Sequence, residues 1–313
     1  MRSPVKKEGH RFRVLSFNIR GGGHAPYYLG ARRPKNGPGI GRIGQDILTH
    51  AIDLVGLQEV FHVAGGTNGS RHHLTDVFRK ERMDVSWGRA TSLATPIAVG
   101  NMNVINTSIF EVIEHSQIVL AGRLATLATL GLNRLFDYRQ RCAQHSLLRF
   151  RTNTGFYGGS AQNCTHINFV NVHLDFSARR RKEGRLLCQY IERFRDAADH
   201  TILVGDFNEE PNGEVVNRIL ECGFLDSMDG SDLLTFRQAG GDLRLKPQGS
   251  SRRIDYVFFT PGNQRGGSST MEMQAPARLV LDQPVTAHPH GSTHPGQHLS
   301  DHCGVLAEFR LTG

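Results

Sequence analysis

The sequence predicts a single α/β domain made of layered sheets rather than a parallel barrel. Short apolar strands alternate with amphipathic helices along the 313 residues, which is the pattern of α/β proteins. No segment repeats at a fixed period, and no linker is long enough to divide the chain. We therefore expect one catalytic domain over residues 13–313, preceded by a disordered, polar tail over residues 1–12.

The first half of the chain is predicted to hold three strands and two short helices. Apolar and polar residues nearly alternate over Arg13–Arg20, which predicts the first strand. Apolar residues recur at helical spacing around residues 43–52 and 74–78. Two further strands are predicted over Asp53–Val60 and Asn103–Val112, and leucines at helical intervals predict a helical insertion over Val119–Leu135.

The second half contains the clearest amphipathic helix, Arg179–Arg195, whose apolar residues fall on one face. A shorter helix is predicted around residues 215–220. The predicted strands of this half are Ser146–Thr152, His166–His173, Thr201–Gly205, Arg253–Thr260 and Gly304–Leu311.

Charge and cysteine content narrow the partners and the compartment. The net charge is +8, which favours a polyanionic partner such as nucleic acid or an anionic membrane surface. Five scattered cysteines without a CxxC pair argue against a disulfide framework or a zinc ribbon. No signal peptide is evident, and the apolar run Gln117–Leu132 is interrupted by Arg123 and too short to cross a bilayer. We expect an intracellular, cytoplasmic protein.

Polar or ionisable residues stand at or near the ends of several predicted strands. One such residue alone is more often a cap or a turn residue than a functional group. Asp255 lies inside the strand RIDYVFF, where a buried carboxylate requires a partner, and histidine is the natural one. The strand-end residues are Asn18, Glu59, His173, Asp206 with Asn208, and Asp301 with His302. Together they predict an active site.

The segments FNIR, LQEV, NVHLD, GDFNEEP, RIDYVF and SDHCGV follow one another in this order. This series resembles the endonuclease/exonuclease/phosphatase superfamily, which includes pancreatic-type deoxyribonucleases, abasic-site endonucleases, inositol polyphosphate 5-phosphatases, neutral sphingomyelinases and poly(A) deadenylases. The resemblance runs from Val14 to Phe309. It implies a four-layer α/β sandwich, in which two mixed β-sheets pack face to face with helices outside and the site lies at one end.

The resemblance also implies a metal-dependent phosphoesterase. Glu59 corresponds to the main metal ligand, with Asn18 beside it, and Asp301 would complete or water-bridge the shell. Oxygen ligands of this kind suit Mg²⁺ or Mn²⁺. His302 corresponds to the histidine that Asp255 orients.

The remaining roles concern water and phosphate. Asp206 would hold or deprotonate the attacking water, although His302 stays open as the alternative base. Asn208 would fix the phosphate or that water, and His173 would donate to a non-bridging oxygen. Arg141 lies where relatives have a substrate-orienting residue, with Arg139 and Arg149 as competing assignments.

Three functions remain open at this stage. The first is a nuclease that hydrolyses DNA or RNA by direct water attack, acting as a monomer. The second is a sphingomyelinase-type phosphodiesterase or phosphoinositide phosphatase, because membrane lipid is also a polyanionic partner. The third is a silent binding module, against which the complete set of site residues argues. Aromatic content is 8% with one tryptophan, so no stacking platform for bases is evident. The segment GNMNVINT departs from the GN-x-(I/L)-LS pattern of many relatives, so the substrate cannot be copied from one of them.

Overall fold

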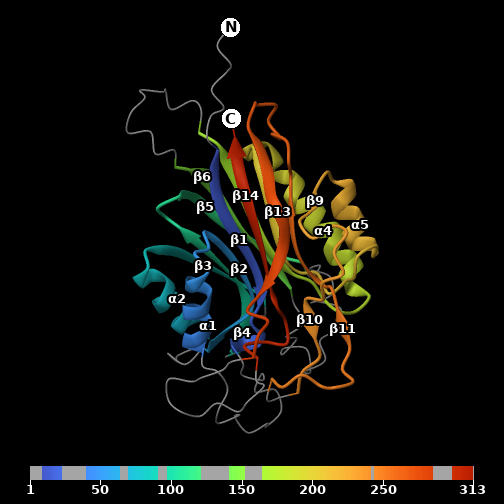
Figure 1. Cartoon of the computed structure of the whole chain (residues 1–313). Helices are drawn as coiled ribbons and strands as arrows, with labels where there is room; N and C mark the ends of the chain where they lie inside the picture. Colours follow the sequence, from blue (N-terminus) through green and yellow to red (C-terminus); the bar gives the residue numbers. More distant parts are fainter. Residues whose placement is uncertain are drawn as a thin grey trace, which may run out of the picture.

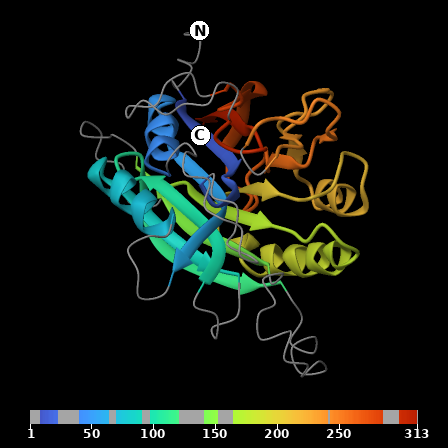
Figure 2. The same cartoon turned by 90° about the horizontal axis from the view of Figure 1, so that it is seen from below.

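Two mixed β-sheets pack face to face, and helices cover both outer faces (Figure 1). The computed structural model describes residues 9–22, 40–63, 70–90, 97–120, 141–151, 164–240, 243–284 and 298–312. The view from below shows one pair of helices on each side of the paired sheets (Figure 2). The predicted four-layer α/β sandwich is confirmed.

The first sheet has six strands in the order β13-β14-β1-β2-β4-β3. Its strands β1 and β2 are parallel, and all other neighbours are antiparallel. The helices α1 and α2 pack on its outer face. The bounds are His10–Asn18 for β1, Ile40–Thr49 for α1, Leu54–Val63 for β2, Ser70–Lys80 for α2, Met83–Arg89 for β3, Ile97–Asn106 for β4, Thr270–Val280 for β13 and Gly304–Thr312 for β14.

The second sheet also has six strands, in the order β5-β6-β7-β8-β12-β9. Here β7 and β8 are the parallel pair. The helices α4 and α5 cover its outer face. The bounds are Phe110–Val119 for β5, Cys142–Phe150 for β6, His166–His173 for β7, Arg179–Arg193 for α4, His200–Asp206 for β8, Glu214–Glu221 for α5, Leu225–Asp226 for β9 and Asp255–Phe259 for β12.

Four small elements complete the described chain. The short strands β10 (Phe236–Arg237) and β11 (Ser251–Arg252) form a separate two-stranded ribbon. The 3₁₀ turn η1 (Arg20–Gly22) follows β1, and η4 (Arg195–Ala197) follows α4. The ribbon lies near the end of β1 and the start of β14, at one end of the sandwich (Figure 1).

An apolar core and a layer of buried amides join the two sheets. Phe12 and Phe309 from the first sheet pack with Phe169 from the second. Nearby, the Gln58 amide donates to Asn171 Oδ1 at 2.8 Å. The sheets approach closely at Gly56, where a Cβ atom would lie 2.3 Å from a Val204 methyl group. This contact fixes the spacing of the two sheets behind the site.

One predicted strand in the middle of the chain was wrong, and the insertion predicted after it begins later than expected. The predicted strand Asn103–Val112 is in fact the end of β4, a turn and the start of β5, because the Ile109 amide bonds back to the Asn106 carbonyl at 3.1 Å. The strand β5 continues to Val119, so this first residue of the predicted helical insertion pairs with Cys142 of β6 instead. The rest of the predicted insertion, from residue 121 on, lies outside the described residues.

The boundaries of the fold also differ from the prediction. The first strand begins at His10, because residues 10–12 pair with Leu311, Arg310 and Phe309 of β14. These three residues were predicted to belong to the disordered tail and instead form part of the sheet. The earlier part of that tail lies outside the described residues. The edge strands β3 and β13 were not predicted. Among the described helices, none has the length and apolar character needed to cross a membrane.

Candidate active site

Three neighbouring strands of the second sheet end at the same place and deliver acidic and imidazole groups. In the register of the sheet, His173 of β7 lies opposite Asp206 of β8, which lies opposite Asp255 of β12. Gly205 permits this arrangement, because a Cβ atom there would lie 2.0 Å from the Val172 carbonyl oxygen. The residue before Asp206 must therefore be glycine for β7 and β8 to stay paired up to the site.

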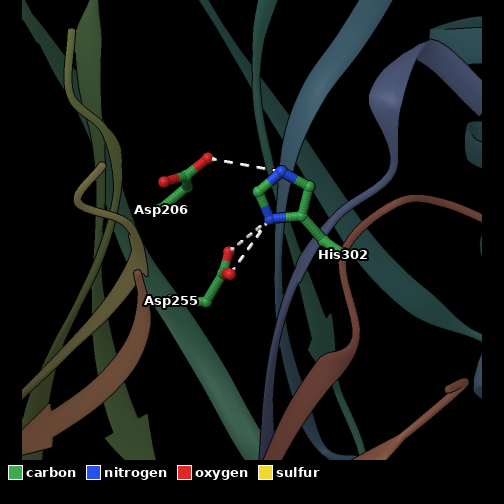
Figure 3. A group of neighbouring side chains, drawn as sticks. All are labelled: Asp206, Asp255 and His302. Atoms are coloured by element: carbon green, nitrogen blue, oxygen red, sulfur yellow. Dashed lines mark hydrogen bonds and ion pairs between the residues drawn. The ribbon is translucent and has the colours of Figure 1, made fainter. Parts of the chain in front are cut away.

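His302 reaches this cluster from the first sheet, where it lies two residues before the start of β14. Its Nδ1 lies 3.0 Å and 3.2 Å from the two oxygens of Asp255, which is fully buried (Figure 3). Its Nε2 points instead to Asp206 Oδ2 at 3.8 Å. The Phe236 ring packs against the imidazole with 5.1 Å between ring centroids. Asp255 thus fixes the orientation of the ring and leaves Nε2 for the site.

Asp206 is the centre of the cluster. Its Oδ1 accepts a hydrogen bond from the Asn208 backbone amide at 2.8 Å, and its Oδ2 accepts one from the Asn18 side chain at 3.0 Å. The His173 Nε2 lies 3.5 Å from the same Oδ2. The spacing of Asp206, Asp255 and His302 would also suit a metal ion, but the hydrogen bond between Asp255 and His302 already uses two of the three groups.

His173 stands between an arginine and an amide. Arg141 Nη1 lies 3.2 Å from His173 Nδ1, so that nitrogen accepts and the proton of a neutral ring sits on Nε2. The Asn208 side chain lies 3.2 Å from Nε2 and donates to the Leu174 carbonyl at 2.9 Å. Asn208 has a positive φ of 51°, a conformation that asparagine tolerates better than most residues. The predicted group of His173, Asn208 and Arg141 is therefore together in space.

Burial and charge shift the titration of this cluster. Burial lowers the pKa of His173 well below its ordinary value, and the charges of Arg141 and His302 lower it further. Burial and the charge of Asp255 raise the pKa of Asp206. Burial alone would lower the pKa of His302, but Asp255, Asp206 and Asp301 together raise it. A neutral His173 and a protonated His302 follow from these directions.

Glu59 enters the site from the first sheet through a β-bulge. The register of β2 against β4 shifts between Leu57 and Val60, and Glu59 has a positive φ of 56°. The bulge turns Gln58 into the layer between the sheets and leaves Glu59 in the cleft, half-buried. Among the described residues, Glu59 makes no hydrogen bond or ion pair with another side chain. It is an acidic group left for a ligand.

The other two predicted metal ligands lie beside a basic residue that the sequence did not single out. Asn18 uses its oxygen to accept the Arg20 backbone amide at 2.9 Å. Asp301 pairs with the Arg20 guanidinium at 2.9 Å. Glu59, Asp301 and Asn18 carry carboxylate and amide oxygens, the donor types that a hard divalent cation prefers, and of these three described residues only Glu59 has no side-chain partner.

Most of the predicted site residues border one cleft of about 590 Å³, whereas Asn18 and Asp255 do not line it; those that do are Glu59, Arg141, His173, Asp206, Asn208, Asp301 and His302. Four further lining residues matter here: Arg20, Arg252, Phe176 and Phe236. No stacking platform is evident from the low aromatic content of the sequence, but three phenylalanines, Phe61, Phe176 and Phe236, border the cleft. Arg20 and Arg252 could have been suspected from their places in FNIR and beside RIDY, but nothing in the sequence marks Phe176.

The model of the Endonuclease/Exonuclease/phosphatase family matches residues 15–302. The chain belongs to this family. Members of the family are phosphoesterase hydrolases and generally use divalent metal ions, so the coarse activity class expected from the motifs is supported. The family motifs are the segments that deliver the clustered side chains, from FNIR at the end of β1 to SDHCGV before β14. No curated protein sequence matches the chain.

Solved structures share the fold at low sequence identity. The catalytic domain of human Nocturnin with a bound sulfate anion superposes with a TM-score of 0.62 at 16% identity, covering 98% of this chain and 96% of that one. TDP2 of D. rerio, complexed with a single-strand DNA product, gives 0.59 at 15%, covering 96% and 98%. A mannosyl-6-phosphatase of Bacteroides thetaiotaomicron gives 0.57 at 18%, covering 95% and 99%. At these identities the likeness establishes the fold and leaves the substrate open.

Proposed function

We propose that this protein is a divalent-metal-dependent phosphodiesterase that hydrolyses nucleic acid. One observation carries the proposal: a single unpaired carboxylate, Glu59, shares a cleft with Asp206, His173 and His302, whose polar atoms are already oriented by the protein. An open acidic ligand beside a fixed proton-handling cluster fits hydrolysis by an activated water.

Glu59, Asn18 and Asp301 are the residues that would hold the metal, as Mg²⁺ or Mn²⁺. The bound cation would polarise the phosphoryl group and stabilise the charge on the leaving oxygen. Arg20 lies against Asp301 and keeps that carboxylate in place before a substrate binds.

Asp206 is our choice for the base that positions and deprotonates the attacking water. Its two oxygens are held by Asn208 and Asn18, which fixes the carboxylate in one orientation. His302, oriented by Asp255, then faces the reacting phosphate as a cation through Nε2. This division of roles favours Asp206 over His302 as the base, because a protonated imidazole cannot accept a proton.

His173, Asn208 and Arg141 would receive the non-bridging phosphoryl oxygens. His173 has its Nδ1 next to the Arg141 guanidinium and its Nε2 directed towards Asp206. Donors fixed in advance stabilise charge that develops in the transition state without reorganising.

A nucleic-acid substrate agrees with the charge of the chain and of the cleft. The net charge is +8, and Arg20, Arg141 and Arg252 all border the cleft. A lipid substrate is less well supported, because six of the seven large hydrophobic side chains that are exposed among the described residues do not line the cleft. A sugar phosphate is the alternative substrate to test, because a mannosyl-6-phosphatase shares the fold.

The test is hydrolysis by the purified full chain of supercoiled plasmid, single-stranded DNA and single-stranded RNA with Mg²⁺. We expect cleavage of at least one nucleic acid, its loss with EDTA, and a loss of about 10²-fold or more in Asp206→Asn. Asp84→Asn is the matched control, because Asp84 is a histidine-paired aspartate that does not line the cleft.

Parallel reactions use sphingomyelin vesicles, phosphoinositide vesicles and a sugar 6-phosphate. Hydrolysis of one of these with no cleavage of any nucleic acid would overturn the substrate class but keep the phosphoesterase. Cleavage that persists in Asp206→Asn would overturn the assigned role of that residue.

A further inference from the structure

Phe176 is a large apolar side chain that is left in solvent at the rim of the cleft. It follows β7 by three residues and is 64% exposed, the largest exposed fraction among the large hydrophobic residues described. It is also the one exposed large hydrophobic residue, among those described, that lines the cleft. Single exposed hydrophobic side chains are common on protein surfaces, so what distinguishes Phe176 is its place at the cleft that holds the candidate catalytic groups.

The backbone that carries Phe176 is braced by buried carboxylates. The Asp175 amide donates to Glu183 Oε2 at 2.7 Å, and the Ser177 amide donates to Asp175 Oδ1 at 2.7 Å. Both acidic residues are buried. The ring is thus displayed from a fixed turn.

The same turn is linked through Arg180 to the segment that carries Asn208. The Arg180 guanidinium donates to the Phe176 carbonyl at 3.4 Å and also to the Asn208 carbonyl. Arg180 is anchored in turn by an ion pair with Glu209 at 3.1 Å. The position of the Phe176 ring is therefore coupled to that of Asn208, a residue assigned to the phosphate.

We propose that Phe176 is a specificity-determining residue that stacks on a nucleobase adjacent to the scissile phosphate. The inference rests on the proposed nuclease function and deepens it, because it assigns recognition of a base to a wall of the cleft. A flat apolar ring in a cleft that three arginines also border suits a substrate in which planar bases alternate with phosphates.

Phe176 is the one strongly exposed ring of the cleft, since Phe61 and Phe236 are half-buried, and this favours a base over an acyl chain. The other exposed large hydrophobic residues among those described do not line the cleft; they are Ile113, Val119, Leu220, Leu225, Leu233 and Leu234. A surface that binds lipid needs a broader apolar face than one ring. A single base needs only one stacking partner.

The experiment compares two strands of equal length and phosphate number, one with bases and one in which every base is replaced by hydrogen. Stacking on an aromatic residue contributes about 5- to 150-fold per base, since 1–3 kcal/mol corresponds to that range. We expect wild-type kcat/KM to favour the base-bearing strand by about 10-fold. In Phe176→Ala this preference falls to near unity, whereas Phe176→Trp keeps it. Leu225→Ala, an exposed apolar residue away from the cleft, serves as the matched control and retains the full preference.

Phe176→Trp also gives a readout that needs no turnover. When this variant is titrated with each strand in EDTA, the base-bearing strand should quench the fluorescence of the added tryptophan and the abasic strand should not. The wild type, which has only Trp87, is the reference. Equal hydrolysis of both strands by the wild type, or an unchanged preference in Phe176→Ala, would overturn the stacking role while leaving the nuclease intact. If neither strand is hydrolysed, the proposed nuclease function is overturned instead. If the base-bearing strand also fails to quench the added tryptophan, the stacking role of Phe176 is overturned as well.

Discussion

Two of the histidines that pair with an aspartate differ in their surroundings: His302 borders the cleft, and His115 does not. His302 Nδ1 lies 3.0 Å from Asp255, and its Nε2 faces Asp206. His115 Nε2 lies 2.7 Å from Asp84, and its Nδ1 lies 2.9 Å from the Ser146 hydroxyl. By distance alone, the second set has the better geometry, and it contains the residue types of a nucleophilic serine triad.

Access separates the two pairs. The Ser146 hydroxyl is fully buried, and the Asn103 amide donates to it at 2.9 Å. No reacting carbonyl or phosphate can reach it there. His302 instead borders a cleft that also contains an unpaired carboxylate and several arginines. A chemical constellation becomes a candidate site when it opens on a space with groups left for a ligand, and not by its internal distances.

The largest expected effect follows from removing the imidazole that faces the cleft. His302→Ala should lower kcat on the cleaved nucleic acid by about 10³-fold, because the charge opposite the phosphate is lost. It should also lower the free energy of unfolding by about 3 kcal/mol, because Asp255 is left buried without its partner. Steady-state kinetics and urea unfolding measure the two effects.

His115→Ala is the control for that change, because it also removes a histidine from an aspartate. We expect its kcat to remain within about twofold of the wild type. A loss of activity in His115→Ala comparable to that in His302→Ala would break the distinction between the two pairs.

Glu59→Gln sharpens the comparison, because within the described part of the chain Glu59 has no side-chain partner to lose. We expect kcat to fall by about 10²-fold while the free energy of unfolding changes by less than about 0.5 kcal/mol. In the wild type, Mg²⁺ that binds the folded state should raise the Tm, and this rise should disappear in Glu59→Gln. Differential scanning calorimetry with and without Mg²⁺ measures it, and an undiminished rise in the variant would remove Glu59 from the metal site.

Arg252 should give a smaller effect that is confined to binding. Its guanidinium lies 5.3 Å from the centre of the Phe236 ring, and no carboxylate among the described residues pairs with it. Arg252→Ala should weaken binding of the cleaved nucleic acid and lower the slope of log K against log salt by about one. Fluorescence anisotropy over a salt series measures the slope. Arg218→Ala, which removes an arginine from α5 outside the cleft, should leave it unchanged.

The sequence could predict the clustered side chains because they follow from where buried strands end. Asp206 comes directly after the apolar run of β8, and His173 closes β7 in the same way, so their meeting follows from parallel pairing. The two motifs also lie within the family pattern. The partner of Asp255 could be inferred as well, since a buried carboxylate requires one.

The edge strands and the cleft rim could not be predicted by the same reasoning. Most residues of β3 and β13 are half-buried or exposed, so their apolar alternation is weak, and β13 also bears register shifts. The turn between β4 and β5 has no glycine or proline, and only the Asn106 side chain, which accepts the Ser108 amide at 3.0 Å, marks it. The exposure of Phe176 depends on the buried carboxylates that hold its turn, and no local pattern encodes that.

The smallest expected effect on activity comes from Ser146, and it closes the comparison between the two pairs. Ser146→Ala should leave kcat unchanged, because its hydroxyl has no path to a substrate, whereas a true nucleophile would lose nearly all activity. It should still lower the free energy of unfolding by about 1–2 kcal/mol, because Asn103 and His115 each lose a hydrogen-bond partner in the space between the sheets. Kinetics and urea unfolding of the same preparation separate these outcomes. A stability loss without an activity loss would assign the second pair to the joint between the sheets, and a loss of activity with intact stability would reverse that assignment.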